Sequence, residues 1–163
     1  MVSALAGDLA ELPVWARDLL ERARVARLGL LDDEDSPRVL PVTFAIHGGA
    51  IWSAIDRKPK RDPDREPARL RYLRRRPQVA LTADQYSDDW RHLAWVQVIG
   101  EATIIPIDDE PGVAEALAQK YAPYGDQRPP GPLIRIEPGR MLCWRAQAGG
   151  SPARGASPIG DGD

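Results

Sequence analysis

The sequence is poor in the residues that bind metals or form disulfides: it has one cysteine, Cys143, and two histidines, His47 and His92, among 163 residues. A single cysteine excludes a framework of intramolecular disulfides. The three side chains lie far apart in the sequence and show no metal-ligand spacing. We therefore expect neither a structural nor a catalytic zinc site.

Long apolar segments are also missing. No run approaches the roughly 18–20 apolar residues that a helix needs to cross a bilayer. The first residues carry acidic side chains early and lack the basic start and apolar centre of a signal peptide. We therefore expect a soluble, cytoplasmic protein with no membrane partner.

The composition predicts one domain, since hydrophobic residues make up 43% of the chain and can form a buried core. The net charge of −2 is unevenly spread, because residues 56–76 hold ten Lys/Arg against four Asp/Glu. This local excess predicts a single anionic partner and argues against general nucleic-acid binding. The alternative is an arginine-rich helix face that is only solvated.

The first half of the chain changes from a helical to a strand pattern. A helix is expected to begin at Pro13, since proline in the first turn loses no hydrogen bond. Pro41 indicates that its strand lies at a sheet edge or contains a bulge. Three predicted strands follow one another through short turns, a pattern that predicts an antiparallel meander. They span residues 25–31, 38–46 and 50–55.

In the second half, Pro67 and Pro77 delimit a short predicted helix, and a second helix is predicted over 109–124. Gly100 indicates a bulge inside a long strand. The predicted strands span 78–84, 94–107 and 133–146, the last as one strand or a strand pair. Gly, Ala, Ser, Pro and Asp predominate after that, so we expect a domain over 1–146 and a disordered tail over 147–163.

The expected fold is mainly β: a six-stranded antiparallel barrel with peripheral helices. A doubly wound parallel sheet fits poorly, because the first three strands follow one another without crossover helices. The sequence also lacks a G-x-G-x-x-G motif after a strand, which argues against a dinucleotide-binding domain.

Five segments, in this order and spacing, carry a resemblance to a known family. They are ARVARLGLL, RVLPVTFAI, IWSAIDRKPKR, RRPQVALTADQYSDDWRHLAWVQVIGEATI and QKYAPYGDQRPPGPLIRIEP. Together they resemble the pyridoxamine 5'-phosphate oxidase-like superfamily, and most closely its actinobacterial branch of deazaflavin-dependent enzymes. The resemblance runs through nearly the whole chain up to Trp144. It implies an FMN-binding split β-barrel that forms a homodimer and shares its cofactor sites between the two subunits.

The resemblance implies a phosphate site at the end of the third strand and in the turn that follows. Arginine binds phosphate through planar bidentate contacts, and lysine adds a compact positive charge. The helix that begins near Pro67 would add the dipole of its N-terminus. The alternative is surface charge that holds no ligand. The implied phosphate residues are Ser53, Arg57, Lys58, Lys60 and Arg61.

The resemblance also implies contacts to the cofactor ring. Backbone groups of Val42 and Thr43 would hydrogen-bond the ring edge, while the Thr43 side chain has the ordinary role of a strand residue. Gln97 matches a position that reaches the cofactor from the partner subunit, and its alternative is a polar residue on a solvent-facing strand. Trp144 matches an aromatic residue near the pocket, with a core or interface tryptophan as the alternative.

One feature, next to the basic turn, departs from this pattern. Asp62 and Asp64 follow the basic turn, where the family has a small hydroxyl residue, and they either cap the next helix or weaken phosphate binding. Asp88, Asp89 and His92 share a polar loop, but no serine there has the context of a nucleophile. We therefore expect no acid/base role for that loop and assign no catalytic residue.

The function that the resemblance implies is hydride transfer between coenzyme F420, a deazaflavin, and an unidentified small-molecule substrate. The cofactor would carry the chemistry, and the protein would orient the reactants. Flavin mononucleotide (FMN) is the alternative cofactor, and a non-catalytic flavin- or deazaflavin-binding protein is the alternative function. A nucleic-acid binder that uses Arg69 to Arg76 is disfavoured, because Tyr72 is the one aromatic residue among those arginines.

The long fifth strand predicts a self-association surface. Trp95, Gln97 and Ile99 point to one face, while Val96 and Val98 point to the other. Only one face can line the barrel interior, so the other needs a partner. Together with the resemblance, this pattern predicts an obligate homodimer.

Overall fold

The computed structural model describes residues 1–55 and 66–146. Its strands are β1 (Ser3–Ala6), β2 (Ala26–Leu31), β3 (Pro37–Val42), β4 (Ala45–His47), β5 (Ala50–Ala54), β6 (Gln78–Gln85), β7 (Ala94–Ile105) and β8 (Leu133–Arg145). Its helices are α1 (Val14–Arg22), α2 (Ala68–Arg75), α3 (Pro111–Lys120) and α4 (Ala122–Asp126), with short 3-10 turns η1 (Leu9–Glu11), η2 (Trp90–His92) and η3 (Ile107–Asp109). The predicted tail after residue 146 lies outside the described residues.

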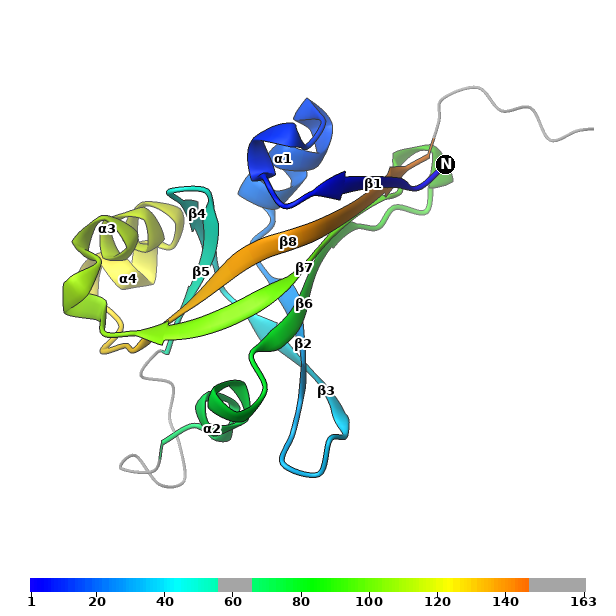
Figure 1. Ribbon diagram of the computed structural model, residues 1–163. Coiled ribbons are helices and arrows are strands. Elements are labelled where there is room, and N and C mark those ends of the chain that lie inside the picture. Colours follow the sequence, from blue (N-terminus) through cyan, green and yellow to red (C-terminus); the bar gives the residue numbers. More distant parts are fainter. Residues whose placement is uncertain (56–65, 147–163) are drawn as a thin grey trace, which may run out of the picture.

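All the strands belong to one antiparallel sheet, in the order β3-β2-β6-β7-β8-β5-β4, with β1 paired to β8 (Figure 1). A mainly β fold with peripheral helices was expected and is confirmed. The expected count of six strands is too low by two. One addition is β1, where no strand was predicted. The other arises because the predicted strand over 38–46 is divided into β3 and β4.

The inner face of the sheet encloses the main core, because its period-two positions are apolar on every central strand. The helices α1 and α2 lie at opposite ends of the sheet (Figure 1) and pack their apolar residues into this core. The fully buried strand residues of the core include Leu28, Leu81, Val96, Val98, Ile136 and Met141. Burial of this size is the main term that stabilises the fold.

A second, smaller core lies on the outer face, where α3 packs over β4 and β5. Trp52, Val113, Leu117 and Leu133 are its larger members. Because β5 lies between the two cores, all of its side chains are buried. The outer face around the middle of β6, β7 and β8 contributes no residue to either core among the described residues.

The predicted strand over 38–46 is divided into β3 and β4, so the predicted meander is interrupted, although β2 pairs with β3 and β4 pairs with β5 as the meander required. The chain leaves the sheet after Val42, and Phe44 turns into the main core, where it is 0% exposed. The following residues form β4, which pairs with β5 and not with β3. We call residues Val42–Phe44 the strand break. Pro41 was expected at an edge, and β3 is indeed the edge strand of the sheet.

The other expected elements are present with small changes of their bounds. The predicted helix over 109–124 is divided into α3 and α4, and the segment 133–146 is a single strand. The register between β7 and β8 shifts between Ile99 and Gly100, which confirms the expected bulge. No helix among the described residues is long and apolar enough to cross a membrane.

Gly100 is required because β8 passes very close to its backbone. A Cβ atom placed on Gly100 would overlap the carbonyl oxygen of Glu137. We expect Gly100→Ala to lower the free energy of unfolding by about 2–3 kcal/mol, since two paired strands must move apart. Urea denaturation of the two proteins measures this difference.

The matched control is Gly125→Ala, since a Cβ atom on Gly125 would meet nothing within 4 Å. This substitution should leave stability unchanged or raise it slightly, because alanine favours the helix. Equal stability of the two variants would contradict the close approach at Gly100.

Candidate functional site

The strand break and the end of β5 lie at the same corner of the molecule. Ala45 pairs with Trp52, so the residues just before β4 lie beside the last residues of β5. Ser53, 1% exposed, pairs with Ile134. The amide of Ile55 donates to the carbonyl oxygen of Pro132 at 3.1 Å, which holds the chain at its exit from the sheet.

The basic turn itself lies outside the described residues. This applies to the predicted phosphate residues Arg57, Lys58, Lys60 and Arg61 and to the neighbouring Asp62 and Asp64. The structure describes the strand that leads into the turn and the helix α2 that follows it, which begins after Pro67.

Most arginines of α2 pair with carboxylates. Several of these carboxylates lie in the turn between β2 and β3. Arg71 donates to Asp33 through two nitrogens at 2.9 and 2.7 Å, and Arg76 donates to Asp35 at 2.7 Å. Arg74 pairs with Glu66 at 2.7 Å. These side chains are half-exposed, so the pairs contribute little stability. They do offset the positive charge of α2.

Tyr121, which directly follows α3, holds the strand break in place. Its phenol oxygen accepts the backbone N–H of Phe44 at 2.9 Å. The same oxygen lies 2.9 Å from the carbonyl oxygen of Phe44 and 3.0 Å from that of Arg24, and its single proton is available to both. Buried backbone groups need partners. One phenol therefore satisfies the amide that the sheet no longer pairs.

Tyr124 contacts Thr43, the residue before Phe44. Its hydroxyl lies 2.9 Å from the Thr43 hydroxyl, and its ring packs against Tyr121 with a centroid distance of 5.5 Å. The Thr43 side chain is thus engaged, and what remains for a ligand at this position is the backbone. No role was predicted for Tyr121 from the sequence. The sequence signal that indicates it is the Y-x-x-Y spacing inside the segment QKYAPYG.

Lys120 places a poorly solvated ammonium beside the strand break. Its Nζ lies 3.9 Å from the centre of the Phe44 ring and 3.5 Å from the carbonyl oxygen of Leu20. Arg24 lies close by, stacked over Tyr121 at 4.7 Å. Burial, with a smaller effect from the Arg24 charge, lowers the pKa of Lys120 to about 8.

Gln97 and Trp144 lie together on the outer face of the sheet, away from the strand break. Trp144 is opposite Trp95 in the β7–β8 register, and the Gln97 amide donates to Thr82 at 3.2 Å. Ser53 faces the inner core with its pairing partner Ile134. The predicted site residues of one chain are therefore divided between the two faces of the sheet.

The polar loop before β7 forms a local cap. The Asp89 carboxylate accepts the backbone N–H of Arg91 at 3.2 Å and its guanidinium at 2.9 and 2.8 Å. These bonds, with a smaller contribution from His92, hold the pKa of Asp89 below its usual range. This arrangement positions η2 and leaves Asp89 a poor general base. In the described part of the chain, no cluster of His, Cys, Asp or Glu is placed to hold a metal ion.

The chain matches the family model described as "Pyridoxamine 5'-phosphate oxidase" over residues 15–145. No curated protein matches the chain.

Solved structures share the fold. An FAD-binding protein from Mesorhizobium loti has 18% sequence identity and a TM-score of 0.63, with 88% of this chain and 96% of that chain covered. A heme-binding protein from Mycobacterium smegmatis has 17% identity and a TM-score of 0.63, with 78% and 51% covered. An F420 reductase has 19% identity and a TM-score of 0.57, with 80% and 98% covered. Such likenesses show the split-barrel fold, whereas the actinobacterial branch stays a prediction.

We expect Tyr121→Phe to lower the free energy of unfolding by about 1–3 kcal/mol, because it leaves the buried Phe44 amide without a partner. Chemical denaturation measures the loss. The control is Tyr86→Phe, since Tyr86 is exposed and its hydroxyl should contribute nothing. A Tyr121 variant as stable as the control would contradict the proposed support of the strand break.

Lys120 should titrate near pH 8, which NMR of labelled lysine side chains can measure because the chain has three lysines. The unfolded chain keeps this proton up to about pH 10.5, so it binds more protons than the folded state between these values. The free energy of unfolding should therefore rise with pH across that window. Lys120→Met should remove both the low-pH resonance and this rise. Three lysines that all titrate above pH 10 would contradict the desolvation of Lys120.

Proposed function

The chain belongs to the pyridoxamine 5'-phosphate oxidase family, and from this premise we propose that it is an oxidoreductase that transfers hydride between coenzyme F420 and a small molecule. The observation that carries the proposal is the corner where the strand break lies beside the end of β5. There the chain can present backbone groups to a ring and, directly afterwards, a basic turn to a phosphate.

The donor set at this corner fits a phosphate-bearing cofactor. The turn after β5 carries Arg57, Lys58, Lys60 and Arg61, and guanidinium and ammonium groups are the side chains that bind phosphate most strongly. In the described residues, the acidic partners of Arg71, Arg74 and Arg76 offset much of the positive charge of α2 and of its C-terminal end.

The ring end of the site would consist of the strand break. Tyr121 and Tyr124 engage the Phe44 backbone and the Thr43 side chain, and these contacts support the strand break from one side. A site held in advance loses less conformational entropy when it binds. A bound deazaflavin would supply the hydride chemistry at its C5 atom, and the protein would supply orientation.

Two alternatives remain and can be separated by experiment. FMN carries a phosphate and a ring of similar shape, and the similar FAD-binding protein supports a flavin as a second candidate. The similar heme-binding protein supports a binding function without turnover. Titration of the purified protein with coenzyme F420 and with FMN compares the cofactors. Oxidation of the reduced cofactor by added acceptors distinguishes an enzyme from a binding protein.

We expect Lys58→Ala combined with Lys60→Ala to weaken cofactor binding at least tenfold, since a hydrogen bond to a charged group is worth about 1.5–3 kcal/mol. The melting temperature without ligand should barely change. The control is Arg128→Ala, since Arg128 is exposed and pairs with Glu115 at 3.6 Å. Unchanged cofactor affinity in the double variant would exclude the phosphate site.

We also propose that the protein is a homodimer whose cofactor sites use both chains. Support comes from the position of Gln97 and Trp144 on the outer face of the sheet, away from the strand break, where one chain alone does not bring them to the proposed ring site. On the outer face, Trp95, Ile99 and Leu142 are only half-buried, and apolar patches of this kind mark interfaces. A two-fold axis would bring Gln97 and Trp144 of one subunit to the strand break of the other.

Light scattering should give twice the chain mass of 18.0 kDa. Ile99→Glu should convert the dimer to a monomer, because it places a charge in the proposed apolar interface. Val39→Glu is the control, since Val39 is 67% exposed on the edge strand β3 and its variant should stay dimeric. A monomeric wild-type protein that binds cofactor would overturn the shared site.

A further inference from the structure

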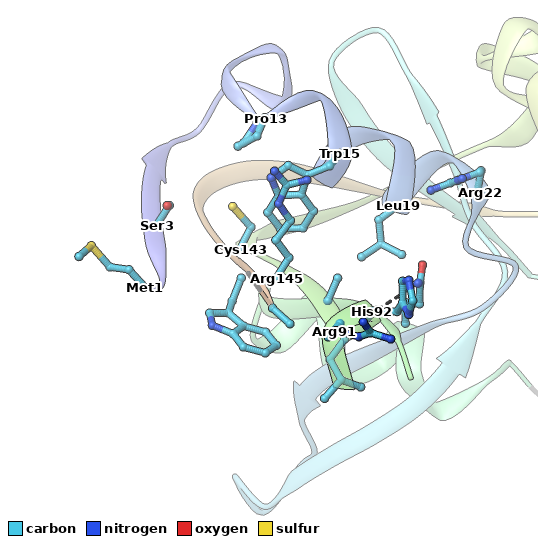
Figure 2. A pocket seen from close by; sticks show the side chains of 15 residues that line it. Met1, Ser3, Pro13, Trp15, Leu19, Arg22, Arg91, His92, Cys143 and Arg145 are labelled. Atoms are coloured by element: carbon cyan, nitrogen blue, oxygen red, sulfur yellow. Dashed lines mark hydrogen bonds between the residues drawn. The ribbon is translucent and has the colours of Figure 1, made fainter. Parts of the chain in front are cut away.

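A cavity of about 1000 Å³ opens at the end of the sheet where β8 finishes, between α1 and η2 (Figure 2). We call it the α1–η2 cavity. Figure 2 shows Trp15 and Leu19 on the α1 side and Arg91 and His92 on the η2 side, with Arg145 between them. Its volume is in the range of small-molecule sites, which is roughly 300–1,000 Å³.

The α1–η2 cavity is positively charged. Three arginines and one histidine line it, and its described lining contains no aspartate or glutamate. This contrasts with the chain as a whole, which has 24 acidic and 22 basic residues. Such a lining attracts anions.

Two of the three arginines have guanidinium groups available to a ligand. Arg91 is engaged with Asp89. Arg22 instead donates its Nε to the backbone carbonyl of Asp18 at 3.2 Å, and Arg145 lies over the Trp15 ring at 5.2 Å. Neither Arg22 nor Arg145 forms an ion pair with a carboxylate in residues 1–55 and 66–146.

The remaining walls are apolar and aromatic. Trp15 and Trp144 lie at the sides, and Leu19, Leu93 and Cys143 supply apolar surface. Burial raises the pKa of the Cys143 thiol, so this side chain is an uncharged part of the wall. Flat aromatic surface beside arginine favours a ligand that is itself planar, because both indole and guanidinium groups stack on such rings.

We propose that the α1–η2 cavity binds a planar aromatic anion, such as an aromatic carboxylate, as a ligand distinct from the cofactor. The proposed phosphate turn follows Ala54, which pairs with Leu133 at the start of β8. The cavity lies at the other end of the same strand, at Cys143 to Arg145. Ten residues of extended strand span roughly 33 Å, so within one chain the cavity and the proposed phosphate turn are separate. The proposal goes beyond the proposed function and does not depend on it.

The test uses two fluorescent probes that differ by one sulfonate. 8-Anilinonaphthalene-1-sulfonate is an aromatic anion, and N-phenyl-1-naphthylamine is its neutral counterpart. Full-length protein is titrated with each probe, and probe fluorescence and tryptophan quenching are measured. We expect one sulfonate probe per chain and much weaker binding of the neutral probe.

The variant is Arg22→Gln combined with Arg145→Gln, with Arg145→Gln alone as a second variant in case the double variant is unstable. Loss of the two charges should weaken the sulfonate at least about tenfold, and loss of Arg145 alone about threefold, while the neutral probe is unaffected. The control is Arg128→Gln, which lies outside the cavity lining and should bind both probes like the wild-type protein.

Three results would overturn the proposal. Equal sulfonate affinity in the double variant and the wild type would place the probe elsewhere, for example on the outer face of β7. Equal loss of both probes would indicate an apolar site without a role for charge. Displacement of the sulfonate by coenzyme F420 or FMN would assign the cavity to the cofactor. Failure of both cofactors to bind would contradict the proposed function but leave this result unaffected.

Discussion

The phenol of Tyr121 is the interaction on which the candidate site depends. A chain that leaves a sheet in the middle of a strand exposes backbone groups that must find new partners inside the protein. Here one side chain from the end of α3 accepts the amide of Phe44 and lies within hydrogen-bond distance of two carbonyl oxygens. This contact and the burial of the Phe44 side chain in the main core together hold the segment away from the ladder. The contact thus couples a peripheral helix to the backbone proposed to hold the cofactor ring.

The two faces of the sheet impose the second constraint. The inner face is filled by the main core and by α1 and α2, while α3 covers only one end of the outer face. Ser53 on β5 faces the inner core, whereas Gln97 on β7 lies on the outer face, so the two side chains do not meet within one chain. One subunit alone would leave the proposed site incomplete, and its outer face carries half-buried apolar residues. A two-fold dimer would resolve both at once, which is why we propose the two features together.

The density of basic residues along the sequence does not show where unpaired positive charge lies in the folded protein. The arginines of α2 lie beside Asp33 and Asp35 of the β2–β3 turn, so much of the basic segment is offset by the fold. Arg22 and Arg145 are far apart in the sequence, and the structure brings them to one cavity. The dense basic segment is partly neutralised, whereas scattered arginines form the α1–η2 cavity. Charge counts along a chain predict a partner only after the carboxylates near each cation are known.

Local pattern alone determined much of this protein. The alternation in β7 predicted that its side chains divide between a buried and a second face, Pro41 predicted an edge position or a bulge, and Gly100 predicted a bulge or bend. These features follow from backbone geometry within a few residues, so the sequence carries them directly. Only the tertiary structure decided that the second strand breaks at Thr43, that β1 joins β8, and that Lys120 is desolvated beside Phe44. Each of these depends on groups that are far apart in the sequence, such as Phe44 and Tyr121, which are 77 residues apart. A local pattern cannot specify them, because the free energy of a buried polar group depends on which distant partner the fold brings within hydrogen-bond reach.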